Sequence, residues 1–315
     1  MSSEATALRG GHVLLITPFD RDGEIDERSL AEHIEFVLAG GVDGIVGLGT
    51  TGEFFTLSPR ERMQLMTLIA ERVGGRTTLT FGVGDSSTRV AIELARHARE
   101  CGADVVMLQS PYYYAHSTAA CDAHFLAVAA AVDLPVMLYD GAAGIEVSVE
   151  RMRRLHEAAP NISYVKMSIP DPSKVAAVVA GAPGVSALCG DENMLVLALR
   201  QGAIGSTVGI GNVLPGAISS LHRAFERDDL AAARAVQIHE LTPLVSVCTN
   251  EKSAYIRCFK EILMRMGIIA SAATRLPLRP LDPLRLEEVL ATVKALSGTS
   301  EDSTPRPAGS AGAPR

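Results

Sequence analysis

The sequence lacks the cysteine and histidine patterns that mark metal sites and disulfide frameworks. Its five cysteines are scattered and odd in number, and no two of them form a Cys-x-x-Cys pair. The eight histidines show neither a His-x-His nor a His-Glu-x-x-His spacing. Because zinc sites and disulfide-rich secreted domains depend on such spacings, we expect no metal and a reducing, cytoplasmic environment.

Basic charge and long apolar runs are also scarce. The 29 Lys and Arg residues against 36 Asp and Glu give a formal net charge of -7, and no Lys/Arg cluster interrupts this balance. A nucleic-acid partner, which needs a basic face, is therefore not expected. No apolar segment is long enough to cross a bilayer, and Met1–Gly10 has no basic stretch followed by an apolar run, so we expect neither a membrane span nor a signal peptide.

What the chain does contain is a regular alternation of short apolar runs and amphipathic helical patterns. The runs are rich in Val, Ile and Leu, as in strands that are buried on both faces. Eight such units in succession predict a closed (β/α)8 barrel, here over residues 11–212. A doubly wound open sheet is the alternative, but its Gly-x-Gly-x-x-Gly turn is absent after the first run. The predicted strands are Val13–Ile16, Gly44–Leu48, Thr78–Phe81, Val105–Leu108, Val136–Tyr139, Ser163–Lys166, Val185–Leu188 and Ile204–Val208.

Segments outside the barrel divide into two tails and a helical extension. Residues 1–10 form an N-terminal tail, and residues 213–296 carry longer helical patterns at Leu214–Arg227, Leu230–Val247 and Ser253–Met266. We interpret these patterns as a C-terminal helical extension that packs on the barrel. Residues 297–315 are mainly Ser, Thr, Pro, Gly and Ala, a composition that predicts a disordered tail.

Reactive groups of barrel enzymes lie where the strands end and in the loops that follow. Several polar and aromatic residues occupy these positions, including four of the six tyrosines of the chain. They are Gly49-Thr50-Thr51-Gly52-Glu53, Pro111-Tyr112-Tyr113-Tyr114, Tyr139-Asp140, Lys166-Met167-Ser168, Gly190-Asp191-Glu192 and Gly205-Ser206-Thr207.

Lys166 is the strongest candidate for a catalytic residue, because Val165 and Met167 embed its amine in an apolar strand. Burial favours the neutral amine, which can attack a carbonyl and form a Schiff base. The alternative is a strand-end lysine that reaches solvent or pairs with a carboxylate.

Tyr139 and the Gly49–Gly52 turn can also each be interpreted in a functional or in a purely structural way. Tyr139 could shuttle protons beside Lys166, or be a core aromatic with a satisfied hydroxyl. The Gly49–Gly52 turn offers amides and hydroxyls to a carboxylate, or is simply a tight turn. The Tyr112–Tyr114 run could instead belong to an interface or a lid.

Taken together, these segments resemble the dihydrodipicolinate synthase / N-acetylneuraminate lyase family of Schiff-base aldolases. The resemblance runs from about Gly11 to Leu281, with its motifs in the family's order. The motifs are Thr17-Pro18-Phe19, Gly49–Glu53, Pro111-Tyr112-Tyr113, Leu138-Tyr139, Val165-Lys166, Lys260 with Gly267, and Arg275-Leu276-Pro277-Leu278.

The resemblance implies a role for each of five residues. Lys166 forms the imine with the keto carbon of pyruvate or another 2-oxo acid, so no separate cofactor is needed. Tyr139 is the proton shuttle and Thr50 the relay hydroxyl, while Thr51 with its neighbouring amides holds the carboxylate. Tyr113 is the third relay member and reaches in from a neighbouring subunit, which implies a homotetramer built as a dimer of dimers.

The chain departs from the family after the tyrosine. The synthases carry an arginine there that binds the carboxylate of the second substrate, whereas the segment Tyr139–Ile145 has no arginine and is one residue shorter before Gly144. Asp140 introduces a carboxylate that we expect close to the imine. The substrate-binding residues that we predict are Thr51, Gly49, Ser168, Gly190, Asp191, Glu192, Ser206 and Asp140.

The sequence therefore predicts a lyase that acts on pyruvate or a substituted 2-oxo acid, with an aldehyde or imine partner that is not the standard one. A dehydratase or deaminase that uses the same imine is an alternative, as are 4-hydroxy-tetrahydrodipicolinate synthase and N-acetylneuraminate lyase proper. A non-catalytic protein that binds 2-oxo acids is the alternative from another class.

Overall fold

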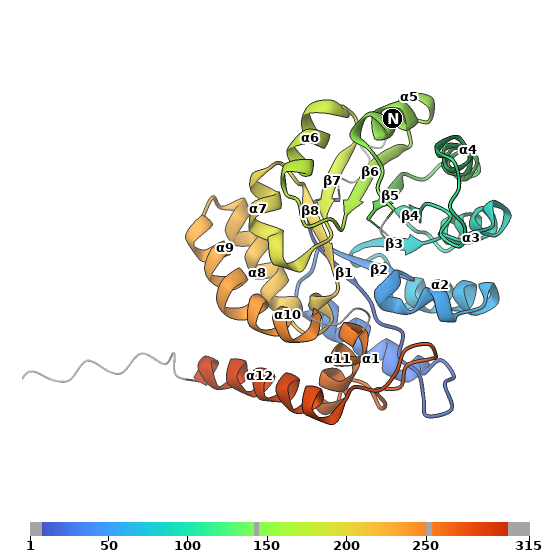
Figure 1. Ribbon diagram of the computed structural model, residues 1–315. Helices are drawn as coiled ribbons and strands as arrows, with labels where there is room; N and C mark the ends of the chain where they lie inside the picture. The colour runs from blue at the N-terminus through green and yellow to red at the C-terminus, as the bar shows by residue number, and fades with distance from the viewer. Residues whose placement is uncertain (1–7, 142–144, 250–253, 302–315) are drawn as a thin grey trace, which may run out of the picture.

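A closed barrel of eight parallel strands, paired in chain order, forms the centre of the molecule (Figure 1). The computed structural model describes residues 8–141, 145–249 and 254–301. The predicted (β/α)8 fold is confirmed, and each predicted strand overlaps an observed one. The strands are β1 (Gly10–Leu14), β2 (Gly44–Gly47), β3 (Thr78–Gly82), β4 (Val105–Gln109), β5 (Val136–Asp140), β6 (Ile162–Met167), β7 (Ser186–Cys189) and β8 (Gly205–Val208).

Helices cover the outside of the barrel, and a polar side chain caps the N-terminus of each of the first five. A Ser or Asp side chain accepts a hydrogen bond from the backbone N–H at the third helical position of each. At Ser58 and Glu61 the bonds are reciprocal and form a capping box. The helices are α1 (Glu27–Ala39), α2 (Pro59–Val73), α3 (Thr88–Glu100), α4 (Thr118–Ala129), α5 (Val149–Ala158), α6 (Ser173–Gly181), α7 (Leu195–Arg200) and α8 (Pro215–Glu226).

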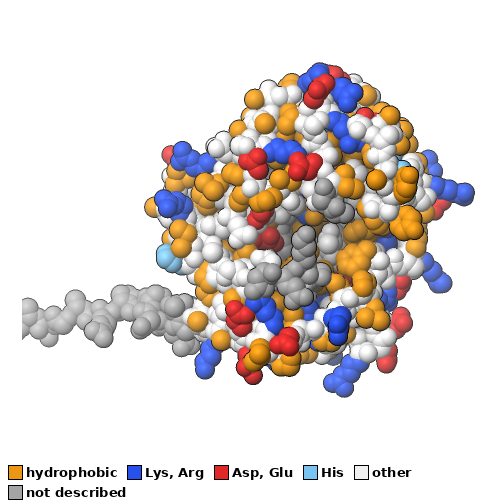
Figure 2. All heavy atoms as spheres, viewed as in Figure 1, with side chains coloured by type: hydrophobic (Ala, Val, Ile, Leu, Met, Phe, Trp, Pro, Cys, Tyr) orange, Lys and Arg blue, Asp and Glu red, His pale blue; other side chains and the backbone are white. Residues whose placement is uncertain are grey.

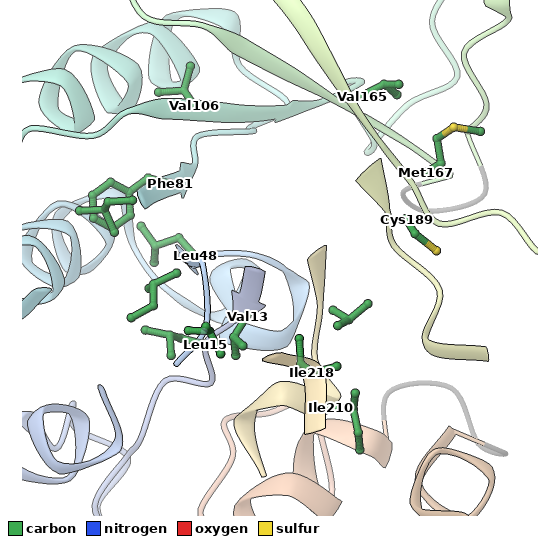
Figure 3. Close-up of a cluster of buried hydrophobic side chains, with 14 of the residues drawn as sticks. Val13, Leu15, Leu48, Phe81, Val106, Val165, Met167, Cys189, Ile210 and Ile218 are labelled. Carbon is green, nitrogen blue, oxygen red and sulfur yellow. The ribbon is translucent and has the colours of Figure 1, made fainter. Parts of the chain in front are cut away.

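Alternation along the strands sorts the side chains into two apolar layers. One layer lies between strands and helices and includes Val165 and Met167 of β6 (Figure 3). The other fills the barrel interior and includes Tyr164 of the same strand, with Met107 and Met137 from neighbouring strands. Lys166 lies two residues after Tyr164 and therefore points toward the interior, where the barrel opens.

The C-terminal extension packs beside α8 and beneath the barrel in the view of Figure 1. It consists of α9 (Leu230–Val236), a π-helical turn (Gln237–Leu241), α10 (Thr242–Thr249), α11 (Ala254–Arg265) and α12 (Pro283–Glu301). Among the described helices, none is long and apolar enough to span a membrane.

Three boundaries differ from the prediction. β1 begins at Gly10, because two successive glycines pair with β8 before the apolar run starts. The π-helical turn interrupts the helix expected at Leu230–Val247. α12 continues to Glu301, past the predicted start of the tail at Ser297, and residues 302–315 lie outside the described part of the chain.

Candidate active site

A cavity of about 660 Å³ opens at the carboxyl ends of the strands, where the sequence places its reactive residues. Figure 2 shows a hollow near the centre of this face, with acidic side chains beside it. Eight of the predicted site residues line the cavity together. They are Thr50, Thr51, Tyr139, Lys166, Ser168, Gly190, Asp191 and Glu192.

Lys166 lies at the floor of this cavity, with only 2% of its surface exposed. Its Nζ is 4.0 Å from the centroid of the Tyr139 ring, which faces it from the paired position on β5. Among the described lysines, Lys174 and Lys260 form ion pairs and Lys166 does not. The amine therefore neither reaches bulk solvent nor pairs with a described carboxylate, which sets aside the two structural alternatives for this residue.

The glycine at position 190 gives Lys166 its room. A Cβ at this position would lie 2.8 Å from Lys166 Cε and 2.4 Å from Ser168 Oγ. The Ser168 hydroxyl donates to the Gly190 carbonyl at 3.1 Å, so the two residues also fix each other. Gly190 thus shapes the cavity by the absence of a side chain.

The Tyr139 hydroxyl is hydrogen bonded to the Lys166 amine. Burial would raise the pKa of the Tyr139 hydroxyl, but the positive charge of Lys166 opposes burial. Hydrogen bonds with Ser168, Lys166 and Thr50 add to that effect and bring the pKa of the tyrosine below its ordinary value. The phenol is therefore easier to ionise than in water, as a proton relay requires.

The turn after β2 presents Thr50 and Thr51 to the cavity on a short 3₁₀ helix, η1 (Thr50–Gly52). Non-glycine residues in the left-handed region flank it, Leu48 at φ 60° and Glu53 at φ 56°. Gly49 supports the turn from inside the barrel and does not line the cavity. A Cβ there would lie 2.6 Å from Leu14 Cδ2, so a larger residue would displace the Leu14 side chain.

Asp191 and Glu192 make one wall of the cavity acidic. Glu192 Oε1 accepts a hydrogen bond from the Gly209 amide at 2.8 Å. Burial raises the pKa of Glu192, although that hydrogen bond and the charge of Lys166 act in the opposite direction. Asp191 accepts a bond from the Asn193 amide and so fixes the start of the short helix that follows.

Asp140 and Ser206 do not face the cavity, which corrects our expectation that they contact the substrate. Each follows an inward-facing position on its strand, and alternate side chains point to opposite faces. The Asp140 carboxylate is buried against α6, where it pairs with Lys174 at 2.7 Å and accepts from the Val147 amide. Ser206 Oγ and His222 Nε2 of α8 are hydrogen bonded at 2.8 Å.

Tyr113 lies in the loop after β4, outside the cavity of its own chain. Its side chain is 89% exposed, and its amide donates to Ser86 Oγ at 3.2 Å. A relay role in this cavity is therefore open to it only from another subunit. The shortened segment at Ala142, Ala143 and Gly144 lies outside the described residues.

The extension supplies cavity residues that reasoning from strand ends missed. Tyr255 of α11 and Thr249 of α10 both line the cavity. Burial raises the pKa of Tyr255, and a hydrogen bond with Thr51 acts against burial. The chain has only six tyrosines, and this scarcity was the one signal in the sequence that could have pointed to Tyr255. Among the described residues, no group of three or more His, Cys, Asp or Glu side chains is placed to hold a metal ion.

The chain is similar to known proteins over most of its length. The profile of the dihydrodipicolinate synthetase family matches residues 7–296. A 4-hydroxy-tetrahydrodipicolinate synthase of Corynebacterium aurimucosum is 38% identical over 285 residues, which cover 87% of this chain and 90% of the relative.

Two solved structures extend the similarity to the fold. The 4-hydroxy-tetrahydrodipicolinate synthase of Methylacidiphilum fumariolicum SolV is 32% identical with a TM-score of 0.88, and the alignment covers 94% of this chain and 98% of that one. YagE, a prophage protein of the dihydrodipicolinic acid synthase family from E. coli K12, was solved in complex with pyruvate. It is 27% identical with a TM-score of 0.86 and coverages of 93% and 99%. This chain therefore belongs to the dihydrodipicolinate synthetase family and is a lyase of that family.

Proposed function

We propose that the Lys166 amine forms an imine with the keto carbon of pyruvate or another 2-oxo acid. The observation that carries this proposal is the buried amine at the cavity floor, beside a phenol and without a described carboxylate partner. The amine attacks the keto carbon, and the hydroxyl of the resulting carbinolamine leaves as water. The protonated imine then accepts the electron pair released when a bond at the adjacent carbon breaks.

Other cavity residues have complementary roles in this proposal. Tyr139, with its lowered pKa, and Thr50 carry protons to and from the carbinolamine and the enamine. Thr51 and the neighbouring amides hold the carboxylate of the 2-oxo acid. Loss of the proton at C3 gives an enamine, which adds to an aldehyde or imine partner, and the reverse sequence cleaves the same carbon–carbon bond.

Exchange of the pyruvate methyl protons in deuterium oxide tests the proposal without knowledge of the second substrate. Proton NMR should show exchange catalysed by the protein and its loss in Lys166→Ala. Lys294→Ala, on the exposed surface of α12, is the matched control and should exchange normally. Exchange that survives in Lys166→Ala would overturn the imine mechanism, whereas binding of pyruvate without exchange would favour a non-catalytic 2-oxo acid binder.

For the second substrate, we propose an aldehyde or imine without a carboxylate at its far end. Among the described residues that line the cavity, Lys166 is the only basic side chain, and Asp191 and Glu192 are the acidic ones. The segment Tyr139–Glu150 contains neither arginine nor lysine to clamp a second acid. Such a wall suits hydroxyl groups, which donate hydrogen bonds to carboxylates.

4-Hydroxy-tetrahydrodipicolinate synthase is the second candidate, because similar relatives carry that name. The ratio of kcat/KM values for aspartate semialdehyde and for neutral hydroxyaldehydes, each with pyruvate, separates the two candidates. A higher value for the hydroxyaldehydes supports our proposal, and ordinary synthase efficiency with aspartate semialdehyde contradicts it.

We also propose that the protein acts as a homo-oligomer, with Tyr113 completing the cavity of a neighbouring copy. Tyr112, Tyr113, Tyr114 and Phe55 are all exposed, and an exposed aromatic cluster of this kind marks an interaction surface. Light scattering should report a dimer or tetramer at micromolar concentration. A monomer that retains full activity would contradict the role of Tyr113.

A further inference from the structure

The helical extension reaches the active-site turn through a buried ion pair. Lys260 of α11 and Glu53, which ends the turn after β2, are both fully buried. Lys260 Nζ donates to Glu53 Oε1 and, at 2.8 Å, to the Ala273 carbonyl. Glu53 Oε2 accepts from the Arg275 amide at 3.1 Å. Both oxygens of this carboxylate are therefore bound by residues of the extension.

Arg275 and Lys260 also contact the same aromatic ring, that of Phe19 in the loop after β1. Lys260 Nζ lies 4.3 Å and the Arg275 guanidinium 4.6 Å from the centroid of Phe19. The guanidinium donates to the Gly23 carbonyl at 2.7 Å and pairs with Glu61 of α2 at 2.6 Å. These contacts connect both cations to the turn and to neighbouring barrel elements.

The backbone conformation of Glu53 is unfavourable for a glutamate, which indicates that its side chain has a role at this position. Its φ of 56° lies in the left-handed region, which a residue with a Cβ adopts at an energetic cost and a glycine adopts freely. A turn without further purpose would favour glycine or asparagine here. A buried ion pair is also a weak source of net stability compared with well-packed apolar groups. The energetic cost of the left-handed backbone at Glu53 is better explained if its carboxylate fixes the geometry of the turn.

That geometry concerns the two threonines of the cavity. The Glu53 amide donates to the Thr50 carbonyl at 3.0 Å, and the Gly52 amide donates to the Gly49 carbonyl at the same distance. Tyr255, on the same helix as Lys260, lines the cavity and is hydrogen bonded to Thr51. Helix α11 thus holds the turn at two places, through Thr51 directly and through Glu53.

We propose that Glu53 is a positioning residue, which fixes Thr50 and Thr51 for the 2-oxo acid by joining their turn to Lys260 and Arg275. This inference rests on the proposed imine chemistry. It predicts that loss of the carboxylate weakens the binding of pyruvate more than it slows the later chemical steps, since the displaced turn is the carboxylate holder.

Glu53→Gln removes the charge and keeps the shape, and Glu61→Gln is its matched control. Glu61 also pairs with Arg275, but it lies on α2 and can still cap Ser58 as a glutamine. The pyruvate concentration at half-maximal methyl exchange should rise roughly ten- to a hundredfold in Glu53→Gln, because small misplacements of binding groups have effects of that order. It should stay at the wild-type value in Glu61→Gln.

The pH dependence of half-saturation by pyruvate separates the positioning role of Glu53 from a merely structural one. Burial lowers the pKa of Lys260 to about 8, although the facing Glu53 acts against burial, while Arg257 and Arg275 add to the lowering. Burial also raises the pKa of Glu53, against the opposing charge of Lys260. Above about pH 8 the wild-type pair therefore loses its cation, and the difference in half-saturation between wild type and Glu53→Gln should shrink. A difference that stays constant across pH 7–9.5 would overturn the proposal.

Amide exchange tests the same network independently of catalysis. Hydrogen–deuterium exchange at Gly52 and Glu53 should be faster in Glu53→Gln than in Glu61→Gln, and unchanged rates would overturn the inference. If Glu53→Gln does not fold, Glu53→Asp serves for the same test. It keeps the negative charge, but its shorter side chain places the carboxylate farther from Lys260. Failure of the proposed function would appear in the wild-type protein itself, as absence of methyl exchange, and the amide measurement would still decide on the network.

Discussion

A single missing side chain leaves room for Lys166, which is buried at the cavity. The Lys166 amine approaches the Tyr139 ring from β6, and a Cβ on Gly190, after β7, would lie 2.8 Å from Lys166 Cε. Any larger residue at position 190 would compete with the lysine for the same volume. The position of the Lys166 side chain thus depends on the glycine at position 190.

Gly190→Ala should slow imine formation at least tenfold, because the added methyl lies 2.8 Å from Lys166 Cε and displaces the amine. Overpacking of this kind also costs about 1–3 kcal/mol of stability. The rate of adduct formation with pyruvate and borohydride measures the first effect, and urea unfolding measures the second.

Gly216→Ala is the matched control, since a Cβ at that position meets nothing within 4 Å. Because Gly216 lies in the first turn of α8, alanine there should leave the rate unchanged and stability equal or higher. A wild-type rate in Gly190→Ala would show that Lys166 has more room than the structure gives it.

At the scale of the elements, the end of β5 is fixed by charges that face away from the chemistry. Asp140 pairs with Lys174 of α6 and accepts from the Val147 amide, so strand, loop and helix meet at one carboxylate. Burial raises the pKa of Asp140, against the opposing hydrogen bond from Lys174. The pair compensates a charge that would otherwise be isolated in the layer behind Tyr139.

Lys174→Met should destabilise the fold by about 3 kcal/mol, because removal of one partner leaves a buried carboxylate unpaired. Urea unfolding at pH 7 measures this loss. The double variant Asp140→Asn/Lys174→Met should recover most of it, since the uncompensated charge is gone. A single variant as stable as wild type would mean that solvent already screens the pair.

The same element shows how far the sequence could predict the molecule. Apolar runs with even spacing predict the strands and the barrel, because strands buried on both faces carry that pattern in any context. Lys166, Tyr139 and Thr50 could be placed together because parallel strands end on one side. The direction of Asp140 could have followed from alternation with Tyr139, but its neighbour Lys174 comes from a helix that no local pattern connects to it.

Residues of the extension could not be placed from local patterns at all. Tyr255 and Thr249 reach the cavity only because α10 and α11 fold back over the strand ends, and that packing depends on long-range contacts such as Lys260 with Glu53. The sequence motif around Lys260 indicated the family, but it carried no information on which part of the site it touches.

At the scale of the whole molecule, buried neutral histidines set the response to acid. His12, His33, His124 and His222 are buried, and burial lowers the pKa of each to about 4. The unfolded chain takes up protons near pH 6.5, whereas the folded chain does not until about pH 4. Between these values the unfolded state binds more protons, so stability falls as the pH falls.

Each such histidine should contribute about 1.4 kcal/mol per pH unit to the slope of the free energy of unfolding against pH within that window. The urea midpoint, measured from pH 7 to pH 4, should therefore drop steeply, and His222→Gln should reduce the slope by roughly one such contribution. His239→Gln, at an exposed position, is the control and should leave the slope unchanged. A midpoint independent of pH over this range would contradict the burial of these side chains.

Borohydride trapping of the complex with pyruvate, followed by intact mass and peptide mapping, is the most direct test of an imine at Lys166. We predict one reduced pyruvate adduct per chain, located on Lys166 and absent in Lys166→Ala. An adduct on another lysine, or none with pyruvate and with larger 2-oxo acids alike, would contradict the imine mechanism.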